Sequence, residues 1–404
     1  MTKKRILFVD DEADILAGLR NVLRKQRHVW DMVFALGAEQ ALAELDKGPF
    51  DVIVSDMRMP GMDGASLLTK VKRDHPCIVR IVLSGHAERE AVIRAVTVAH
   101  QFLSKPCDGD VLRARIESMC GLQSLLHDPG ILHVIGTFAQ LPCAPKVFMQ
   151  LTEMLAKEKV DVADIAQIVE RDPAMAAKVL QLVNSEYFGL SQRISSIHQA
   201  VTYLGVELIE ALAVSIHVSE GPELKSIPGF SIDRVQSNAF SMARLARRLA
   251  SGAEAAEEAF AAAMLHDVGK IILALGMPDR FAETIRVAAE TRRPAHDVER
   301  ELLGLTHAEV GAYLLGVWGL PFRIVEAVAY HHTPSRAPGA ASEILTTVHV
   351  AATMIDWANT LQMHPAECED ALDMSYLESA GCAVTLPRWR EMAIAEVSRM
   401  PDAA

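Results

Sequence analysis

Hydrophobic and polar residues follow different patterns in the two parts of the chain. Over the first 120 or so residues, five short apolar runs alternate with segments of helical period such as ADILAGLRNVLRKQ; the runs are RILFV, MVFA, DVIVS, RIVLS and QFLS. β-rich runs that alternate with amphipathic helices are typical of a parallel sheet covered by helices on both faces. The first part therefore predicts an α/β domain with five parallel strands.

From about residue 129 the strand pattern stops. Segments such as VADIAQIVERD, AMAAKVLQLVNSEYFG and EAFAAAMLHDVGKIILAL have the helical period and are separated by Gly and Pro. The most loop-like stretch of this half is TPSRAPGAAS, at residues 333–342. The second part therefore predicts an all-helical domain.

Polar residues stand at the ends of the predicted strands. Asp10 and Asp11 end the first strand, Asp56 the third and Ser84 the fourth, and Lys105 follows the fifth. The carboxyl ends of parallel strands meet in the crevice where ligands bind. Acidic groups there suit Mg²⁺, with Asp56 as the nucleophile of a phosphoryl transfer and Lys105 and Ser84 contacting the phosphoryl oxygens. Each residue alone also fits a cap, a turn or a loop, but together they favour the site.

Four segments, FVDDE, VSDMRMPGMDG, LSG and FLSKP, carry a family resemblance. Residues 4 to about 122 resemble the receiver domain of bacterial response regulators, which has a flavodoxin-like fold. The resemblance implies that Asp56 accepts a phosphoryl group from a sensor histidine kinase. It also implies Mg²⁺ bound by Asp11, Asp56 and the backbone carbonyl of Arg58, with Asp10 assisting through water.

The same resemblance assigns two further features. Phe102 occupies the position of the switch aromatic, whose rotamer follows the phosphorylation state, and the Lys105–Pro106 bond is expected to be cis. Charge added at Asp56 would draw in Ser84 and let Phe102 turn inward. We expect this to remodel the segment 87–99, the fifth strand and the helix 108–120, which leads into the helical part.

A second resemblance lies in the helical part. Its segments are IVERDPAMAAKVLQLVNSEYFG, ISSIHQAVTYLG, AAMLHDVGK and LTHAEVGAYLLGVWGLPFRIVEAVAYHH. Over about residues 140 to 332 the chain resembles the HDOD family, a relative of the HD phosphohydrolases. The resemblance implies a helical bundle in which a helical N-terminal subdomain precedes the half related to HD enzymes.

The His266–Asp267 doublet raises the question of a metal site. An imidazole and a carboxylate can serve one cation and help it to activate water. The resemblance implies that active HD enzymes bind metal through an H…HD…D set, and alignment places Asn238 at the first position and Thr353 at the last. Asp356, one helical turn later, contests that register. We expect a site that has lost two of its four ligands.

Three further histidines, His307, His331 and His332, match extra ligand positions of the HD-GYP phosphodiesterases. With His266 and Asp267 they would form a residual cation site. The Gly-Tyr-Pro loop itself is missing, because HHTPSRAPGAA stands in its place. The simpler interpretation is a buried hydrogen-bonded pair that orients two helices, and we expect no catalytic residue and no cofactor in this domain.

Composition and charge narrow the function. The net charge of -12 over 404 residues argues against a nucleic-acid phosphate binder, which would carry a basic face. The six cysteines form no CxxC pair, and no run approaches the roughly 18 uninterrupted apolar residues of a membrane helix. We expect a cytoplasmic protein that does not enter a membrane.

The sequence thus predicts a receiver domain at 1–122, a linker at 123–138, an HDOD domain at 139–340 and a C-terminal helical extension at 341–404. We expect a two-component response regulator, phosphorylated on Asp56, whose HDOD domain acts by binding an unidentified protein. The alternative is a receiver-regulated, metal-dependent phosphohydrolase or cyclic dinucleotide phosphodiesterase. The pattern favours the non-enzyme, and a nucleotide ligand and a homodimer stay open.

Overall fold

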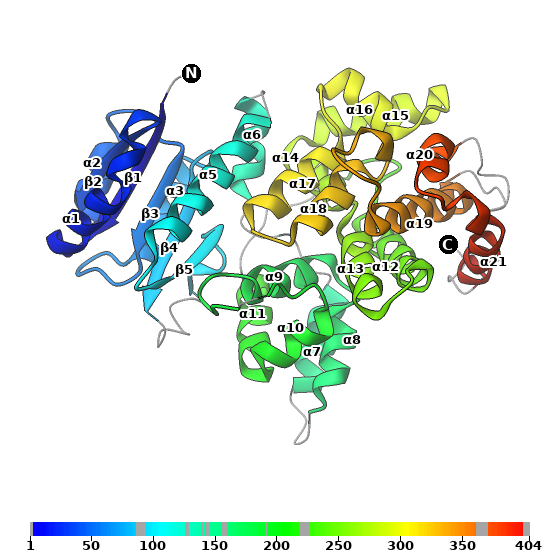
Figure 1. Ribbon diagram of the computed structural model, residues 1–404, viewed down its shortest axis with the longest axis horizontal. Helices are drawn as coiled ribbons and strands as arrows, with labels where there is room; N and C mark the ends of the chain where they lie inside the picture. The colour runs from blue at the N-terminus through cyan, green and yellow to red at the C-terminus, as the bar shows by residue number, and fades with distance from the viewer. Residues whose placement is uncertain are drawn as a thin grey trace.

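The computed structural model describes residues 3–85, 94–125, 129–138, 141, 145–155, 160–190, 192–218, 226–360 and 371–398. The α/β domain lies at one end of the molecule, and two groups of helices follow it (Figure 1). One group, α7 to α11, lies below the junction in this view, and the other, α12 to α21, lies opposite the sheet.

The N-terminal domain is built on a five-stranded parallel sheet in the order β2-β1-β3-β4-β5. The apolar runs of the sequence form its strands, which are β1 Lys4–Asp10, β2 Trp30–Leu36, β3 Val52–Asp56, β4 Val79–Gly85 and β5 Gln101–Lys105. All five residues of β3 are buried, as expected for a central strand with helices on both faces. The predicted fold of this domain is confirmed.

Helices cover both faces of the sheet, and they are α1 Ala13–Val22, the 3₁₀ helix η1 Leu23–His28, α2 Ala38–Leu45, α3 Gly64–Asp74 and α5 Gly109–Leu125. The start of α3 shows how the sequence sets a boundary, because the Asp63 side chain accepts the Ser66 N–H at 2.9 Å. The next residue must be small, since a Cβ at Gly64 would lie 2.1 Å from the backbone oxygen of Asp56. This close approach fixes the loop behind the third strand.

The rest of the described chain is helical. Helix α6 Pro129–Thr137 lies beside the sheet domain, and the first group comprises α7 Pro145–Leu155, α8 Val162–Val169, α9 Pro173–Val183, α10 Ile197–Leu204 and α11 Val206–Val218. Helix α9 begins at an Asp172 cap followed by Pro173, a favoured helix start, and all its residues are buried. Figure 1 shows α9 at the top of this group, next to the sheet domain.

The second group forms a larger helical bundle. Its helices are α12 Ile232–Leu249, α13 Ala253–Leu265, α14 Val268–Gly276, α15 Pro278–Thr291, α16 Ala295–Leu303, α17 His307–Val317, α18 Phe322–Tyr330, α19 Glu343–Thr360, α20 Met374–Ser379 and α21 Leu386–Val397, with 3₁₀ turns Pro334–Arg336 and Ala383–Thr385. The stretch Ala253–Gly276 is long and apolar enough to cross a membrane, but 83% of its most apolar window is buried inside the protein. Helices in the core of a folded domain are typically buried to this extent.

Two stretches differ from the expected domain plan. The linker expected at 123–138 contains helix α6, which packs against α3 of the sheet domain and α14 of the bundle. The extension expected from residue 341 begins with α19, which packs against α12, α13 and α18 in the interior of the bundle. Helix α6 thus contacts both domains and α19 lies inside the helical bundle, which the sequence pattern alone did not reveal.

A buried guanidinium joins the sheet domain to α6. Arg80, at the start of β4, has no exposed surface, and burial lowers its pKa to about 9. Its nitrogens donate to the backbone oxygens of Pro76, Ile78, Val98 and Gly136 at 2.7 to 3.1 Å, and one lies 2.8 Å from His100 Nε2. Gly136 belongs to α6, so one side chain ties the connecting helix to the sheet.

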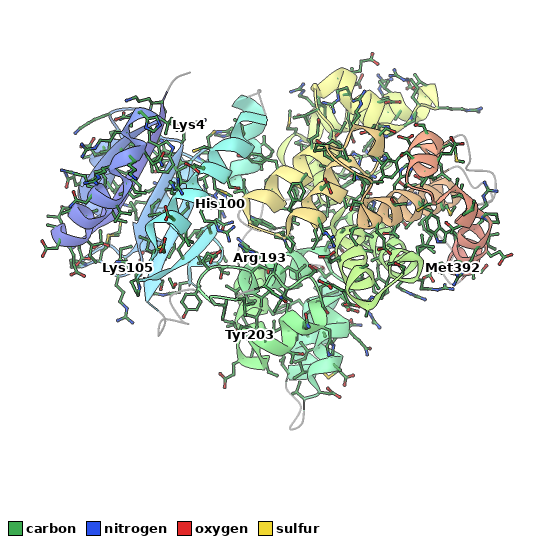
Figure 2. The ribbon with its side chains drawn as sticks, viewed as in Figure 1. Lys4, His100, Lys105, Arg193, Tyr203 and Met392 are labelled. Carbon is green, nitrogen blue, oxygen red and sulfur yellow. The ribbon has the colours of Figure 1, made fainter. Side chains whose placement is uncertain are left out.

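Three further contacts join the two domains directly. Gln181 of α9 donates to the backbone oxygen of His100 at 2.9 Å. Gln101 of β5 donates to the backbone oxygen of Val317 at 2.7 Å. Arg115 of α5 is ion-paired with Glu186. Figure 2 labels His100 on the side of the sheet that faces the helices.

We predict that Arg80→Met lowers the free energy of unfolding by at least about 2 kcal/mol, because it leaves buried carbonyl groups without their donor. Denaturant unfolding followed by circular dichroism measures this. Arg73→Ala is the matched control, because Arg73 is 72% exposed and its ion pair within the described residues is with its neighbour Asp74, so its loss should change stability by less than about 0.5 kcal/mol. Equal stability of Arg80→Met and the wild type would refute this role.

Candidate functional site

A carboxylate–lysine cluster lies at the carboxyl ends of the strands. Lys105 is the last residue of β5. Its Nζ is 2.7 Å from Asp10 Oδ2 and is also ion-paired with Asp56 Oδ1. The second oxygen of Asp56 accepts the Arg58 N–H at 2.9 Å. Asp56 is 6% exposed and Asp10 1% exposed, whereas Asp11 lies on the surface. The strand ends thus bring together the residues that the sequence singled out.

The electrostatics of this cluster make Lys105 the central group. Burial raises the pKa of Asp56, and the nearby ammonium of Lys105 only partly opposes that rise. Burial alone would lower the pKa of Lys105, but its hydrogen bonds and ion pairs with Asp10 and Asp56 outweigh it and raise the pKa. The lysine therefore stays charged beside two buried carboxylates.

Of the predicted switch residues, Ser84 lies at this end of the sheet, whereas Phe102 lies near the amino end of β5. Ser84 ends β4 and is 1% exposed, and Phe102 in β5 is fully buried. The Lys105–Pro106 peptide bond is cis, as predicted. Of the expected switch segment 87–99, residues 87–93 lie outside the described part, as do 126–128 of the connecting region.

The donor set of this site fits a hard divalent cation. Asp10 and Asp56 present carboxylate oxygens at the carboxyl ends of their strands, Asp11 follows directly after β1, and the charge of Asp10 contributes to the raised pKa of Asp56. A cation there would offset that repulsion, and magnesium prefers oxygen ligands of this kind. The fit supports the assignment of Asp11, Asp56 and the Arg58 carbonyl as ligands.

The second cluster surrounds the junction of α13 and α14. His266 follows α13 and Asp267 precedes α14, and they are 1% and 4% exposed. The ring nitrogens of His266 differ: Nδ1 lies 2.6 Å from the backbone oxygen of Ala263, while Nε2 lies 3.4 Å from Asp267 Oδ2. The ammonium of Lys270 approaches the same Oδ2 at 2.6 Å.

Helix α17 brings a third histidine to this junction. A Cβ at Gly269 would lie 1.9 Å from the backbone oxygen of His307, so a glycine is needed where the two helices meet. His307 Nδ1 lies 2.7 Å from Glu299 Oε2, and Nε2 lies 3.2 Å from Asp267 Oδ1. Burial would lower the pKa of His307, but Glu299 and Asp267 outweigh burial and raise it to about 9.

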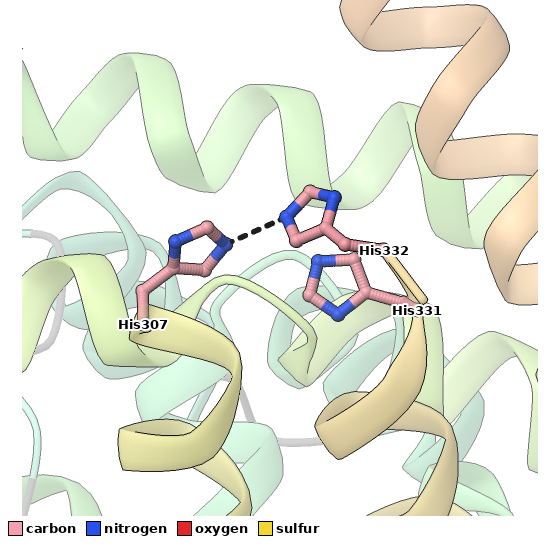
Figure 3. A group of neighbouring side chains, drawn as sticks. All are labelled: His307, His331 and His332. Atoms are coloured by element: carbon pink, nitrogen blue, oxygen red, sulfur yellow. Dashed lines mark hydrogen bonds between the residues drawn. The ribbon is translucent and has the colours of Figure 1, made fainter. Parts of the chain in front are cut away.

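The last two histidines of the cluster, His331 and His332, directly follow helix α18. Figure 3 shows the rings of His331 and His332 facing His307, with His332 Nε2 3.0 Å from His307 Nε2. Burial depresses the pKa of both rings well below the ordinary value, so both are neutral near pH 7. His331 directs Nδ1 to the backbone oxygen of Val328 at 2.8 Å, which leaves Nε2 toward the cluster.

Three ligand atoms in this cluster are buried and make no well-aligned hydrogen bond in the described part of the chain, namely His266 Nε2, Asp267 Oδ1 and His331 Nε2, although the first two lie 3.4 Å from Asp267 Oδ2 and 3.2 Å from His307 Nε2. One ligand atom from each of these residues lies within 4.8 Å of the other two, and the same holds for His307, His331 and His332. Buried polar atoms rarely lack a partner. Geometrically, the cluster could therefore hold a cation, which the sequence pattern had argued against.

The structure also bears on the contested register. Asp356 of α19 lies close enough to Lys270, Asp267 and His266 for their charges to act on it, and burial raises its pKa. Asn238 on α12 and Thr353 on α19 are half-buried. Helix α19 thus places the Asp356 carboxylate, which contested the register of Thr353, within electrostatic reach of the cluster.

Sequence reasoning missed two members of the cluster. Glu299 is buried and accepts both the backbone N–H, at 2.8 Å, and the ring of His307. The His296 ring stacks on His332 with centroids 4.1 Å apart. Both stand just before His307 in HDVERELLGLTH, and the only available signal was an acidic residue spaced two helical turns from a histidine.

A cavity of about 470 Å³ opens beside the cluster. His296 and His332 form part of its wall, and Tyr313, Phe322 and Tyr330 supply aromatic surface. Arg300 also lines it but is paired with Glu309 at 2.7 Å. The cavity has the size of a small-molecule site.

Comparison with known proteins agrees with this architecture. Residues 6–117 match the response regulator receiver domain and residues 141–334 match the HDOD domain. An uncharacterized protein of Treponema pallidum is 26% identical over 214 residues, which are 52% of this chain and 41% of that protein. The hydrogenase transcriptional regulatory protein HoxA of Cupriavidus necator is 37% identical over 128 residues, 30% of this chain and 26% of that protein.

The chain therefore spans less than half the length of these curated relatives. Among solved structures, a virulence factor from Campylobacter jejuni aligns with a TM-score of 0.54 at 18% identity, over 68% of this chain and 99% of that one, and this likeness concerns the fold. The two family matches cover separate, consecutive parts of the chain that correspond to the sheet domain and the helical domain. The chain thus contains a response regulator receiver domain followed by an HDOD domain.

Proposed function

We propose that Asp56 accepts a phosphoryl group from a sensor histidine kinase and that this modification controls the HDOD domain. The observation that carries the proposal is the position of Lys105, which ion-pairs with both Asp56 and Asp10 at the strand ends. A carboxylate nucleophile beside a fixed cation is the arrangement that phosphoryl transfer needs.

The chemistry follows from these positions. An oxygen of Asp56 attacks phosphorus, an acyl phosphate bond forms, and the bond to the donor's leaving group breaks. Bound magnesium would neutralise charge on the phosphoryl oxygens. Lys105 then pairs with the new phosphoryl group, and the Ser84 hydroxyl donates a hydrogen bond to one of its oxygens.

For the HDOD domain we propose an output through binding of a protein partner. Asn238 stands where an imidazole ligand of an active enzyme is expected, and Lys270 already contacts one oxygen of Asp267. An ammonium 2.6 Å from that oxygen competes with a metal for it. These features disfavour a pair of metals able to activate water.

A metal-dependent phosphohydrolase is the second candidate. The three ligand atoms without a well-aligned hydrogen bond, on His266, Asp267 and His331, favour it. The hydrogen bonds of the opposite ring nitrogens also favour it. His266 and His331 direct Nδ1 to backbone oxygens, and His307 directs Nδ1 to Glu299. Metal-binding histidines are usually oriented in this way. The adjoining cavity also leaves room for a nucleotide.

We predict that the wild type, incubated with Mg²⁺ and a small phosphodonor, gains one acid-labile phosphoryl group and that Asp56→Ala gains none. Removal of the nucleophile prevents formation of the acyl phosphate. Intact-protein mass spectrometry measures the added mass. Asp46→Asn is the control, since Asp46 is an exposed carboxylate at the end of α2 and should label like the wild type. Undiminished labelling of Asp56→Ala would show that another residue is the acceptor.

We predict that the purified protein does not hydrolyse cyclic dinucleotides when Mn²⁺ is supplied and carries well under one transition metal per chain. His266→Ala should change only stability, by roughly 1–3 kcal/mol, because a buried partner loses its neighbour. Metal analysis, chromatography of the nucleotides and thermal unfolding test these points. Stoichiometric metal, with turnover abolished in both His266→Ala and His331→Ala, would establish the second candidate instead.

A further inference from the structure

We propose that strand β5 and helix α17 connect the phosphoacceptor to the histidine cluster, so that a change at either site alters the other. Gln101 is the residue that joins the two elements. The proposal rests on the proposed phosphorylation of Asp56 for its biological role, but the coupling itself belongs to the fold and can be measured without phosphorylation.

The first element has its two ends in different environments. At the carboxyl end of β5, Lys105 is paired with Asp10 and Asp56. At the amino end, four residues earlier and about 13 Å away for an extended strand, Gln101 is 3% exposed and faces the HDOD domain. Between them Phe102 is fully buried. A displacement of Lys105 therefore acts on a strand whose other end contacts the helices.

The junction between the elements is short and buried. Gln101 Nε2 donates to the backbone oxygen of Val317 at 2.7 Å, and Val317 is the last residue of α17. Gly319 follows with a φ of 77°, and a Cβ there would lie 2.6 Å from Gln101 Nε2. The helix end and the glutamine side chain are therefore packed with no space for a side chain between them.

The second element leads from this junction to the histidine cluster. Helix α17 runs from His307 to Val317, a length of about 15 Å. It starts at a capping box in which Thr306 and Glu309 satisfy each other's backbone groups. Its first residue, His307, contacts Glu299, Asp267 and His332. A helix capped at one end and hydrogen-bonded at the other moves as a unit.

A parallel contact makes β5 a two-point attachment. The residue before Gln101, His100, accepts the Gln181 side chain of α9 through its backbone oxygen. The ring of His100 lies 2.8 Å from the guanidinium of Arg80. The start of β5 is thus held by both helical groups, and in the described part of the chain the Gln101 hydrogen bond is the one that joins β5 to α17, against which α5 also packs. Coupling through packed, rigid elements with one defined junction predicts that removal of that junction uncouples the sites.

The experiment perturbs the receiver end and observes the cluster end by amide hydrogen exchange. Lys105→Ala releases the carboxyl end of β5, and we expect exchange in the segment 305–317 to accelerate by about five-fold or more, the lower range of ordinary allosteric coupling. In a Gln101→Ala background the same substitution should change exchange there by less than about two-fold. Peptides of α12 serve as the internal reference for any general loss of stability.

Arg115→Ala is the matched interface control. It removes the ion pair between α5 and Glu186 but leaves both β5 and α17 intact, so the effect of Lys105→Ala on segment 305–317 should persist. Gln101→Met, which keeps the side-chain volume but removes the donor, guards against a packing defect in Gln101→Ala. Loss of the effect in Arg115→Ala, or its persistence in both Gln101 variants, would overturn the proposed route.

A reciprocal measurement separates this inference from the proposed function. His307→Gln should change the lifetime of the phosphoryl group on Asp56 by a factor that disappears when Gln101 is also replaced, a double-mutant cycle. If Asp56 takes up no phosphoryl group, the proposed function fails while the exchange experiment still decides the coupling. If labelling succeeds and exchange at 305–317 does not respond to Lys105→Ala, the coupling alone is wrong.

Discussion

The arrangement of the two domains depends on one buried cation, the Arg80 guanidinium, whose hydrogen bonds in the described part of the chain go to four backbone carbonyl oxygens and one imidazole. Arg80 gathers backbone oxygens from the sheet domain and from α6, and its contact with His100 fixes the start of β5. A guanidinium can do this because it offers five donors in a rigid plane. Without Arg80, the start of β5 and helix α6 would lose the side chain that hydrogen-bonds to both. The contacts of Gln101 and Gln181 would then change their geometry.

The receiver domain was largely predictable because its signals are local. A strand ends where an apolar run ends, and parallel strands bring those ends together, so Asp10, Asp56 and Lys105 could be placed before any coordinates. The link from Gln101 to Val317 could not, because it joins residues 216 positions apart through one amide and one carbonyl. Neither glutamine nor valine stands out in its own segment.

Most residues of the histidine cluster could be predicted from the sequence, but their protonation states could not. The doublet and the three histidines were visible as residues, whereas Glu299 became visible only once α16 and α17 were packed together. The Glu299 carboxylate favours the protonated form of His307, and Lys270 is ion-paired with Asp267. The cluster therefore already contains two positive charges of the protein itself. Spacing in a sequence gives candidate ligands but does not show which internal charges compete with a metal.

The position of α19 changes what counts as a folding unit in this chain. The family match ends at residue 334, yet α19 inserts an apolar face between helices of the bundle, with Ile344, Val348, Ala351 and Ile355 almost fully buried. It also carries His349, whose ring lies 2.7 Å from the backbone oxygen of His331. A fragment that ends at residue 334 would expose the apolar surface that α19 covers and would remove the contact of His349 with His331. We therefore expect such a fragment to aggregate.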